Sequence, residues 1–501
     1  MCLVAGFMTL LDVSIVNVAL PSIRGGLHAS QSGLQWVLSG YALMFGLVLV
    51  PAGRMGDVRS RRAVFVTGLV AFTATSALAG AAQSETWLVA ARLLQGVAGA
   101  VLVPQVSGFI QQMFHGAERG RAFGMLGATI GLSTAVGPLL GGLLIQAFGA
   151  QEGWRWVFYV NLPIGLAVLP AACRLLPGPS AAQRGDGRGG RRDLDPAGVL
   201  LLGAGTVLLL LPFVQQEQWP GAAKWLLVPA AVAVLALFAG WERHYARRRE
   251  PLVDLTLFRQ RSYGLGVLLS LVYFAGFTAI FFILTLYLQN GMRYTALEAG
   301  LSIMPFAVGS GVAAAVGGRK ATRLGRPLVA GGLAAVLVGL LGTALAVRMD
   351  TTHSVGWAMA VPLLFAGVGS GLVVAPNQTL TLGEVPVARA GSAGGVLQTA
   401  QRIGSAAGIA AVGSVYFTRV DSRHADWQGG FQLGLLTATG LVVLALAVAL
   451  LDIATGRRGA ARQARSAPGA PVAGEAVPGP SDAPRDDDGL PPAAPRDVGV
   501  R

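Results

Sequence analysis

The sequence predicts an all-α membrane protein whose fourteen transmembrane helices are arranged as six, two and six. Three observations lead to this prediction. The 501-residue chain is 53% hydrophobic and only 12% charged, which is more apolar surface than the core of a water-soluble protein can bury. Apolar stretches of about 20 residues, the length that crosses a bilayer, follow one another along the chain. Segments of the first half also recur in the second half.

Short polar connections separate the fourteen apolar stretches. The predicted spans cover residues 2–22, 33–53, 63–82, 87–111, 122–148, 155–176, 197–215, 222–241, 263–289, 296–316, 327–347, 356–382, 391–418 and 430–452. The last part of the chain is rich in Pro, Ala, Gly, Asp and Arg and has little apolar content. Such a segment cannot form a hydrophobic core, so we expect it to be disordered.

An internal repeat relates the two ends of this helix series. The run GRMGDVRSR recurs in weaker form as GRKATRLGR, and three glycines of the fifth span recur 267 positions later. These glycines are Gly124, Gly127 and Gly137, which match Gly391, Gly394 and Gly404. Spans two to five therefore match spans ten to thirteen, so two inserted helices separate two pseudo-repeated six-helix bundles. Secondary transporters that move two bundles about a central site have this plan.

The spans and the repeat together predict six segments. These are an N-terminal six-helix bundle over 1–176, a cytoplasmic linker over 177–196, two inserted helices over 197–241, a cytoplasmic loop over 242–262, a C-terminal six-helix bundle over 263–454 and a disordered cytoplasmic tail over 455–501.

The net charge of +14 reflects the distribution of basic residues over the loops. Most Lys and Arg residues outside the spans occur in alternate loops. Because basic loops stay in the cytoplasm, both termini are expected to be cytoplasmic. The excess of Arg over Lys indicates a GC-rich bacterial genome, and hence a bacterial plasma membrane. The basic residues do not gather on one soluble face, so we expect no nucleic-acid partner.

Four sequence motifs resemble those of a known family. They are LDVSIVNVALP from Leu11 to Pro21, GRMGDVRSRR from Gly53 to Arg62, RLLQGVAGA from Arg92 to Ala100, and GPLLGG from Gly137 to Gly142. On these motifs the chain resembles the fourteen-span drug:proton antiporters of the major facilitator superfamily, the EmrB/QacA type, over about residues 1–452. The resemblance implies the major facilitator fold, and the GPLLGG run implies antiport.

Asp12 lies near the middle of the first span, where a carboxylate is costly unless it is neutralised, paired or hydrated. Burial favours its protonated form and a nearby cation its charged form, so access and protonation could be coupled. Arg92, inside the fourth span, needs an anionic or carbonyl partner. We expect Asp12, with Gln95 and backbone carbonyls as lesser partners, and the resemblance implies that Arg92 assists proton transfer. In the alternative, Asp12 only hydrogen-bonds Asn17 or a neighbouring helix, and Arg92 is a structural or snorkelling cation.

Polar and aromatic side chains of several spans are candidates for the substrate cavity. The set comprises Asn17, Gln95, Gln398, Arg402 and Phe277. Arg402 has no acid in its own span, so it could bind substrate, pair with Asp12, or only join helices by hydrogen bonding. Phe277 shares a helix face with Phe274 and Phe281, which could stack on lipophilic drugs, although simple packing is the favoured interpretation of these aromatics.

The loop after the second span contains the candidate latch residues Gly53, Asp57, Arg61 and Arg62. Asp57 lies close to the start of the third span, where the helix dipole favours a carboxylate, and it could pair with Arg61 or with a facing helix end. Such contacts would form in one access state and break in the other. The alternative is an ordinary basic cytoplasmic loop. In the second half Thr322 replaces the aspartate, so we expect a stronger latch on the first half.

Glycines and a proline of the fifth span form a candidate seam between moving helices. They are Gly131, Gly137, Pro138, Gly141 and Gly142. Gly137 and Gly141 are one turn apart, which lets another backbone approach, and Pro138 removes a hydrogen bond and bends the helix. Close packing alone explains the glycines equally well, so the proline and the resemblance are what favour a moving seam.

The sequence predicts proton-coupled export of a hydrophobic or amphipathic small molecule by alternating access. The expected partners are that molecule, protons and the lipid bilayer, and the chain is expected to act as a monomer without a cofactor or metal. It contains no G-x-x-x-x-G-K-S/T run for ATP. The spans contain one clear acid and no His, which disfavours an enzyme. The alternatives are a proton-coupled importer or facilitator, and a membrane sensor or enzyme.

Overall fold

The computed structural model describes residues 1–149, 151–178, 195–214, 219, 221–350, 352–422 and 426–466. Within these residues the chain is helical and has no β-strand. Fourteen of the described helices are long and apolar enough to cross a membrane, which confirms the number of predicted spans. Residues Met1–Ala454 form one compact unit.

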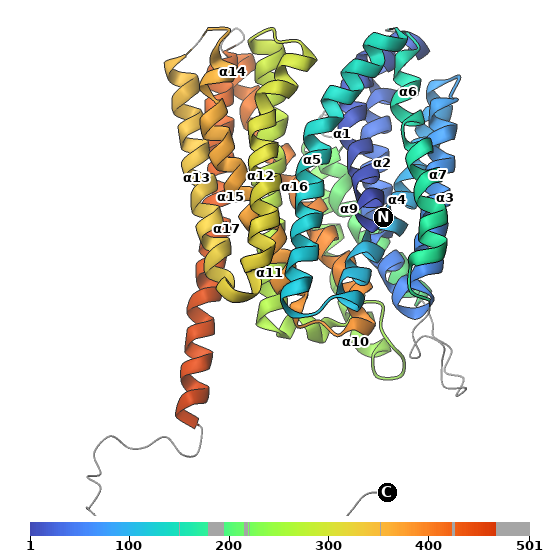
Figure 1. Cartoon of the computed structure of the whole chain (residues 1–501), viewed down its shortest axis with the longest axis vertical. Helices are drawn as coiled ribbons and strands as arrows, with labels where there is room; N and C mark the ends of the chain where they lie inside the picture. The colour runs from blue at the N-terminus through green and yellow to red at the C-terminus, as the bar shows by residue number, and fades with distance from the viewer. Residues whose placement is uncertain are drawn as a thin grey trace, which may run out of the picture. The chain divides into compact units, whose positions relative to one another are not determined.

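The first predicted bundle contains six spans (Figure 1). They are α1 (Cys2–Leu27), α2 (Gln31–Val58), α3 (Arg61–Gly80), α4 (Glu85–Met113), α5 (Gly116–Phe148) and a broken span made of α6 (Gly153–Tyr159) and α7 (Asn161–Leu175). Ser30, Ser60 and Ser84 precede α2, α3 and α4, and each side chain accepts a hydrogen bond from the backbone N–H three residues later. These caps satisfy donors that a helix start leaves unpaired.

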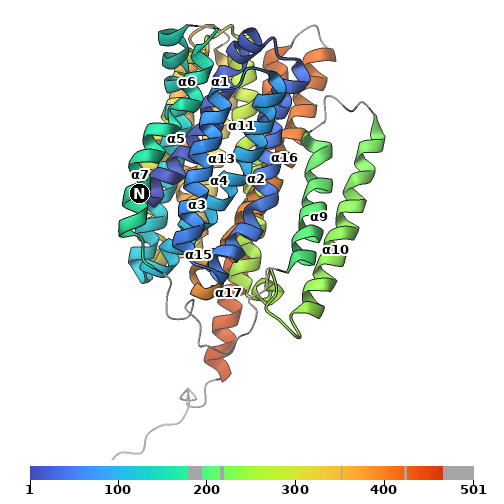
Figure 2. The same ribbon diagram turned by 90° about the vertical axis from the view of Figure 1, so that its right-hand side faces the viewer.

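Two inserted helices lie beside the main bundle (Figure 2). They are α9 (Pro196–Val214) and α10 (Leu227–Tyr245), and the 3-10 turn η1 (Ala222–Leu226) precedes α10. The two helices pack against each other, and α9 also contacts α2 and α16 (Ala390–Ser422). Most of the predicted linker before α9, residues 179–194, lies outside the described residues.

The second predicted bundle follows the 3-10 turn η2 (Leu255–Arg259). It contains α11 (Arg261–Leu286), the π-helical turn η3 (Tyr287–Gly291), α12 (Ala296–Leu324), α13 (Arg326–Met349), the short α14 (Val355–Ala358), α15 (Ala360–Gly383), the 3-10 turn η4 (Val387–Arg389), α16 and α17 (Trp427–Ser466). Helix α17 continues past the predicted span to Ser466. The rest of the predicted tail, 467–501, lies outside the described residues.

Each bundle has a hydrophobic core of its own. One buried cluster runs from Leu269 to Ala449 and another from Ile15 to Phe158. A third cluster combines residues of both bundles, such as Phe109 and Leu397. Between the bundles, α5 packs along α12 and α2 packs along α16. These two helix pairs therefore form the main contact through which one bundle meets the other.

The turns α4–α5 and α12–α13 lie at the same end of the compact unit, at the bottom of Figure 1. Arg119 and Arg121 follow the first of these turns, and Arg319, Arg323 and Arg326 flank the second. We call this end the basic end. The loops at this end are the basic loops that the positive-inside rule assigns to the cytoplasm.

Candidate transport site and gating contacts

A buried polar cluster in the first bundle centres on Asp12, which has no exposed surface. Asp12 Oδ2 accepts a hydrogen bond from Arg92 Nη1 at 2.6 Å, and Arg92 is itself only 1% exposed. Asp12 Oδ1 accepts hydrogen bonds from Gln95 Nε2 at 2.9 Å and from Asn161 Nδ2 at 3.1 Å. Helices α1, α4 and α7 supply these groups, so a neutral ion pair joins three helices of the first bundle.

The polar groups around this ion pair are also hydrogen-bonded. Ser76 Oγ on α3 accepts hydrogen bonds from Gln95 Nε2 at 2.6 Å and from Asn161 Nδ2 at 3.0 Å. Arg92 donates from Nε to the Val37 carbonyl oxygen at 3.1 Å and from Nη1 to Gln95 Oε1 at 2.7 Å. Buried charges require such partners because water is not there to solvate them.

The partners expected for Arg92 are all present, namely Asp12, Gln95 and a backbone carbonyl. Asn17, in contrast, is exposed, and its side-chain amide donates to the Val13 carbonyl oxygen of its own helix at 3.2 Å. Asn161 was not among the predicted residues, although it is an isolated amide in an apolar span. The structure therefore adds Asn161 to the cluster and leaves Asn17 outside it.

The Asp12 carboxylate is closed off from solvent in this conformation. Its oxygens point at partners within the first bundle, not into an open cavity. Exchange of a proton at Asp12 therefore requires a second arrangement, in which Arg92 or Gln95 moves away and water enters.

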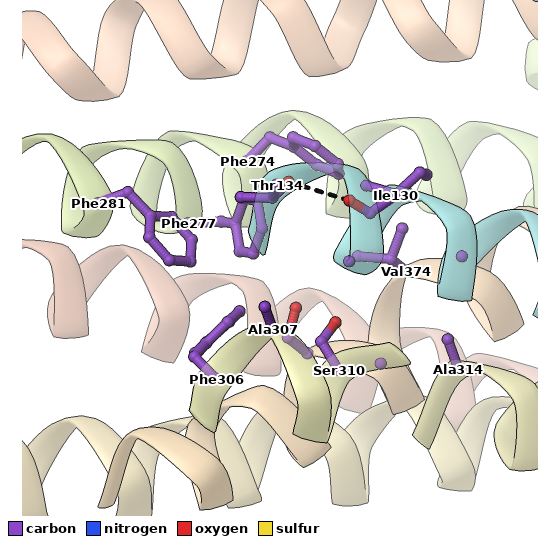
Figure 3. Close-up of a pocket in the computed structure, with 14 residues that line it drawn as sticks. Ile130, Thr134, Phe274, Phe277, Phe281, Phe306, Ala307, Ser310, Ala314 and Val374 are labelled. Atoms are coloured by element: carbon purple, nitrogen blue, oxygen red, sulfur yellow. Dashed lines mark hydrogen bonds between the residues drawn. The ribbon is translucent and has the colours of Figure 1, made fainter. Parts of the chain in front are cut away.

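An apolar pocket of about 430 Å³, its open mouth included, lies between α5 of the first bundle and α11, α12 and α15 of the second (Figure 3). Four phenylalanines line it: Phe274, Phe277, Phe281 and Phe306. The centre of the Phe277 ring is 5.1 Å from that of Phe281 and 5.9 Å from that of Phe306. Of the predicted cavity residues, Phe277 belongs to this pocket. An aromatic lining of this kind suits a lipophilic molecule.

Arg402 lies where α16 faces α2. The central carbon of its guanidinium group is 4.6 Å from the centre of the Phe45 ring. Gln398, one turn earlier on α16, is 8% exposed. Asp12 has its partners inside the first bundle, so the pairing of Arg402 with Asp12 that the sequence left open is absent from this conformation.

At the basic end, Asp57 joins the two bundles. Its Oδ1 accepts a hydrogen bond from the Gly391 N–H at 2.9 Å, and its Oδ2 accepts one from the Ser392 N–H at 2.7 Å. Arg61 Nη2 donates to Asp57 Oδ1 at 2.8 Å and to the Val387 carbonyl oxygen at 2.5 Å. One carboxylate thus holds the start of α16, and one guanidinium bridges that carboxylate to the turn before it.

The helix dipole that stabilises Asp57 differs from the one that the sequence suggested. Helix α2 continues to Val58, so Asp57 lies in the last turn of α2 and not at the start of α3. A carboxylate is unfavourable at its own helix C-terminus, but it faces the N-terminus of α16, where unpaired N–H groups attract negative charge. The facing helix end, which the sequence offered as one option, is the actual partner together with Arg61.

Glycines let the backbones of the two bundles touch at this end. A Cβ atom at Gly53 would overlap the Gly391 carbonyl oxygen, and one at Gly318 would overlap the Gly120 carbonyl oxygen. Gly53 and Gly318 correspond in the internal repeat, so the two contacts are pseudo-symmetric. Thr322, which replaces the aspartate in the second half, is exposed. The acidic contact is therefore confined to the first half of the repeat.

The remaining polar contacts show which end is closed. Arg119 Nη1 donates to the Gly383 carbonyl oxygen at 2.9 Å. Arg62 instead donates to the Leu176 carbonyl oxygen at 3.4 Å, inside the first bundle. The hydrogen bonds that Arg61, Arg119 and Asp57 make with the second bundle all lie at the basic end. The two bundles are thus held together at that end.

Two of the predicted seam residues face the second bundle. A Cβ atom at Gly131 would lie 3.1 Å from the Ala307 carbonyl oxygen on α12. Pro138, which lies within α5, is 3.3 Å from the position that a Cβ at Gly300 would occupy. This part of α5 follows α12 closely.

The other seam glycines have different surroundings. A Cβ at Gly137 would overlap the Ser14 side chain on α1, and one at Gly141 would lie 3.0 Å from Ile15 on the same helix. Nothing lies within 4 Å of a Cβ at Gly142. The GPLLGG run therefore packs mainly against α1, the helix that carries Asp12, rather than against the second bundle.

These features define the class of protein. Two related helix bundles that touch through glycines, with one end closed by polar contacts and an apolar pocket between them, are the architecture of a secondary transporter. The chain belongs to the Major Facilitator Superfamily, whose family model matches residues 2–409. This match and the fourteen candidate spans confirm the predicted fold class. Together with the relatives described next, they confirm the resemblance to the fourteen-span EmrB/QacA type.

Several bacterial relatives are similar over most of their length. The chain is 36% identical to the probable actinorhodin transporter of Streptomyces coelicolor, over 84% of this chain and 72% of that protein. It is 32% identical to the tetracenomycin C resistance and export protein of Streptomyces glaucescens, over 84% and 75%. It is 34% identical to the cephamycin export protein CmcT of Amycolatopsis lactamdurans, over 89% and 90%.

Solved structures share the fold at low sequence identity. The human organic anion transporter MFSD10 has a TM-score of 0.62 at 16% identity, and the match covers 89% of this chain and 98% of that one. The proton:xylose symporter XylE has a TM-score of 0.62 at 15% identity, with 89% and 93% covered. At these identities the likeness concerns the fold alone.

Proposed function

We propose that the chain exports a hydrophobic or amphipathic small molecule, such as an antibiotic, in exchange for protons. The two relatives named above as export proteins support the direction of transport. The phenylalanine pocket supports an apolar cargo. In this proposal the protein lies in the bacterial plasma membrane with the basic end and both termini in the cytoplasm, as the loop charges favour.

The buried pair of Asp12 and Arg92 is the observation that carries proton coupling. At 0% and 1% exposure, both charges depend on each other for compensation. Protonation of Asp12 would remove that compensation, so Arg92 would have to find another acceptor or move towards water. A proton at this site thereby changes the packing of α1 against α4 and α7. This is the chemistry by which proton binding can favour one access state over another.

The contacts at the basic end supply the matching conformational element. Asp57 and Arg61 hold the start of α16 while the end is closed. In the proposed cycle these bonds break when the basic end opens to collect cargo from the cytoplasm, and they form again before cargo leaves on the other side. The α5 seam, close to α12 near Gly131 and to α1 near Gly137, links this movement to the helix that carries Asp12.

The proton gradient provides enough free energy for such export. One charge that moves inward through 100 mV releases about 2.3 kcal/mol, and this supports a cargo gradient of about fiftyfold per proton. A pH difference adds to this amount.

Efflux from inverted membrane vesicles tests the proposal. We expect wild-type vesicles to accumulate an aromatic dye when a proton gradient is imposed, and Asp12→Asn vesicles to lose this gradient-dependent uptake. The matched control is Glu118→Gln, which removes an exposed acid in the first turn of α5 and should leave uptake unchanged. Gradient-dependent uptake that survives Asp12→Asn would reject coupling at this residue, and uptake only into right-side-out vesicles would indicate an importer.

A further inference from the structure

Arg402 projects from the face of α16 that approaches α2. A Cβ at Gly391 would overlap the Gly53 carbonyl oxygen, and one at Gly395 would lie 2.7 Å from the Leu49 carbonyl oxygen. The next contact along this face is that of Arg402 with the Phe45 ring at 4.6 Å. At 1.5 Å per residue, Arg402 lies about 18 Å along α16 from Ala390. It therefore lies above the part of the interface that these glycines close.

The charge of Arg402 is not balanced by an acid. Asp12 already pairs with Arg92, so that pair is neutral. No ion pair or hydrogen bond joins Arg402 to another residue in the part of the chain that the structure describes. Arg402 is partly exposed, so an unbalanced positive charge lies beside Phe45 where α16 faces α2. An uncompensated cation at this depth is costly, and an anion that reached it would be strongly attracted.

Further polar groups near Arg402 also lack partners. The centre of the Tyr41 ring lies 4.3 Å from the central carbon of the Arg92 guanidinium, and the ring stacks on Phe45, the ring that Arg402 contacts. The Tyr41 hydroxyl is buried without a hydrogen-bond partner. Thr399, one turn before Arg402 and 7% exposed, also has a buried hydroxyl without a partner. A guanidinium and two hydroxyls provide several donors in one region, and the acceptor that would satisfy them is an anionic oxygen.

We infer that Arg402, with the Tyr41 hydroxyl, forms a subsite for an acidic group of the exported molecule, which is therefore an aromatic or amphipathic anion such as a carboxylic acid or an acidic phenol. The inference rests on the proposed function and specifies the cargo of the same transporter. The Phe45 ring beside the guanidinium adds an apolar surface next to the charge, so an aromatic acid fits better than a small hydrophilic one.

Small inorganic anions share this chemistry, and chloride could satisfy Arg402 as well. The apolar and aromatic surroundings favour an organic anion. A chloride ion gains nothing from Phe45 or from the phenylalanines of the pocket, and it loses its hydration on entry. Varying the chloride concentration in the binding experiment distinguishes chloride from an organic anion as the occupant of the subsite.

Binding of two dyes with the same ring system and opposite charge tests the inference. Fluorescein is an anion near neutral pH and rhodamine 123 is a cation, and both contain the xanthene ring. Fluorescence anisotropy on the purified full-length protein should show tighter binding of fluorescein. Arg402→Gln should weaken fluorescein binding by about tenfold or more, because it removes a charge-assisted hydrogen bond. Arg402→Lys should keep most of the preference for the anion.

Arg348→Gln is the matched control, because it removes one exposed positive charge from the last turn of α13. It should leave the affinity for both dyes unchanged. Tyr41→Phe, which removes one hydroxyl and keeps the ring beneath Arg92, should weaken fluorescein binding by a smaller factor than Arg402→Gln. A normal thermal unfolding profile of each variant shows that lost binding does not reflect lost folding.

Equal affinity of the wild type for both dyes, no binding of fluorescein, or an Arg402→Gln variant with full fluorescein affinity would each overturn the inference. Fluorescein affinity that rises as chloride is replaced by gluconate, in the manner of simple competition, would assign the subsite to chloride. The binding experiment needs no proton gradient. A charge preference without gradient-driven export would therefore reject proton coupling and keep the subsite. Gradient-driven export without a charge preference would reject the subsite and keep proton coupling.

Discussion

Arg92 cannot be exchanged for another polar residue without leaving Asp12 unbalanced in a site that has no exposed surface. We expect Arg92→Gln to destabilise the protein by about 3–5 kcal/mol, which is the cost of leaving one charge of a buried pair alone. The double variant Asp12→Asn with Arg92→Gln should recover part of that loss, since it removes both charges. Thermal unfolding in detergent measures both effects.

The same measurement can contradict this expectation. If the double variant is destabilised by the sum of the two single effects, Asp12 and Arg92 do not stabilise each other and the ion pair has no energetic role. A coupling energy of the expected sign would instead show that the charges act as one unit.

The sequence was sufficient to predict that Asp12 pairs with Arg92, because each needs a partner inside a membrane. It was not sufficient to predict Asn161 and Ser76, because hydropathy does not show which face of α3 or α7 turns inwards. Asn17, which the sequence assigned to the substrate cavity and offered as an alternative partner of Asp12, does not hydrogen-bond Asp12 in this conformation, and the reason is geometric. It lies five positions after Asp12, and five residues correspond to a rotation of about 140° around a helix, so the two side chains point in different directions.

At the scale of the helix, the glycines of the GPLLGG run differ in what a methyl group would meet. Gly137→Ala places a Cβ into Ser14 on α1, whereas Gly142→Ala meets nothing within 4 Å. We expect Gly137→Ala to lower both stability and transport rate. Gly142→Ala should leave transport unchanged and stabilise α5 by about 0.5–1 kcal/mol, because alanine loses less entropy in a helix.

Transport assays in vesicles, combined with thermal unfolding, compare the two glycine variants within one motif. Equal effects of the two substitutions would mean that the packing of α5 against α1 does not matter for transport. Loss of transport in Gly142→Ala alone would point to a contact made only in the other access state.

The contact between α2 and α16 should respond to loss of the Asp57 charge. Asp57→Asn keeps the shape but removes the negative charge that faces the N-terminus of α16. We expect the state closed at the basic end to lose about 1–2 kcal/mol, a shift of about five- to thirtyfold towards the open state. Spin labels on Arg59→Cys and Ala388→Cys, both exposed positions, measure this shift as a longer distance.

Arg62→Gln is the control for that measurement, because Arg62 bonds within the first bundle. Its distance distribution should match that of the wild type, with Cys2 and Cys173 replaced in every variant. If Asp57→Asn also matches the wild type, the carboxylate does not hold the bundles together.

The number and approximate position of the spans could be predicted because apolar length is written directly in the sequence. The interruptions could not. Three features depend on how each segment packs: the break between α6 and α7, the separate turn α14 before α15, and the extension of α17 to Ser466. The sequence offered a facing helix end as a partner of Asp57, but it could not identify that helix as α16, since Gly391 lies more than 300 residues away and the repeat relates equivalent helices, not facing ones.

At the scale of the whole molecule, the charges that move in one cycle set its response to the membrane potential. Outward movement of a monovalent anion and inward movement of a proton each carry one positive charge inward. One exchange therefore releases about 4.6 kcal/mol per 100 mV of membrane potential. We therefore expect a potential alone, imposed by a potassium diffusion gradient without a pH difference, to drive fluorescein uptake into inverted vesicles. Arg402→Gln should abolish most of this uptake.

A pH difference applied at zero potential is the companion experiment. Uptake that responds to the pH difference but not to the potential would mean that the exchange is electroneutral, which would contradict export of an anion against protons. Rhodamine 123 provides the comparison, because exchange of a monovalent cation for one proton moves no net charge.

The repeat in the sequence predicted two similar bundles, and it did so because gene duplication leaves matching residues in matching helices. It gave no information about which end is closed, because both access states contain the same helices. That information came from the contacts of Gly53, Asp57 and Arg119 with the second bundle.

The backbone contact of Gly53 with Gly391, and its counterpart between Gly318 and Gly120, has a consequence for leakage. Where side chains close a channel, the flip of one rotamer can admit an ion for a moment. At these two points main-chain atoms of the two bundles touch, so no change of rotamer opens them. A path through either point requires the two helices to separate, which limits leakage there to the moments when the bundles move.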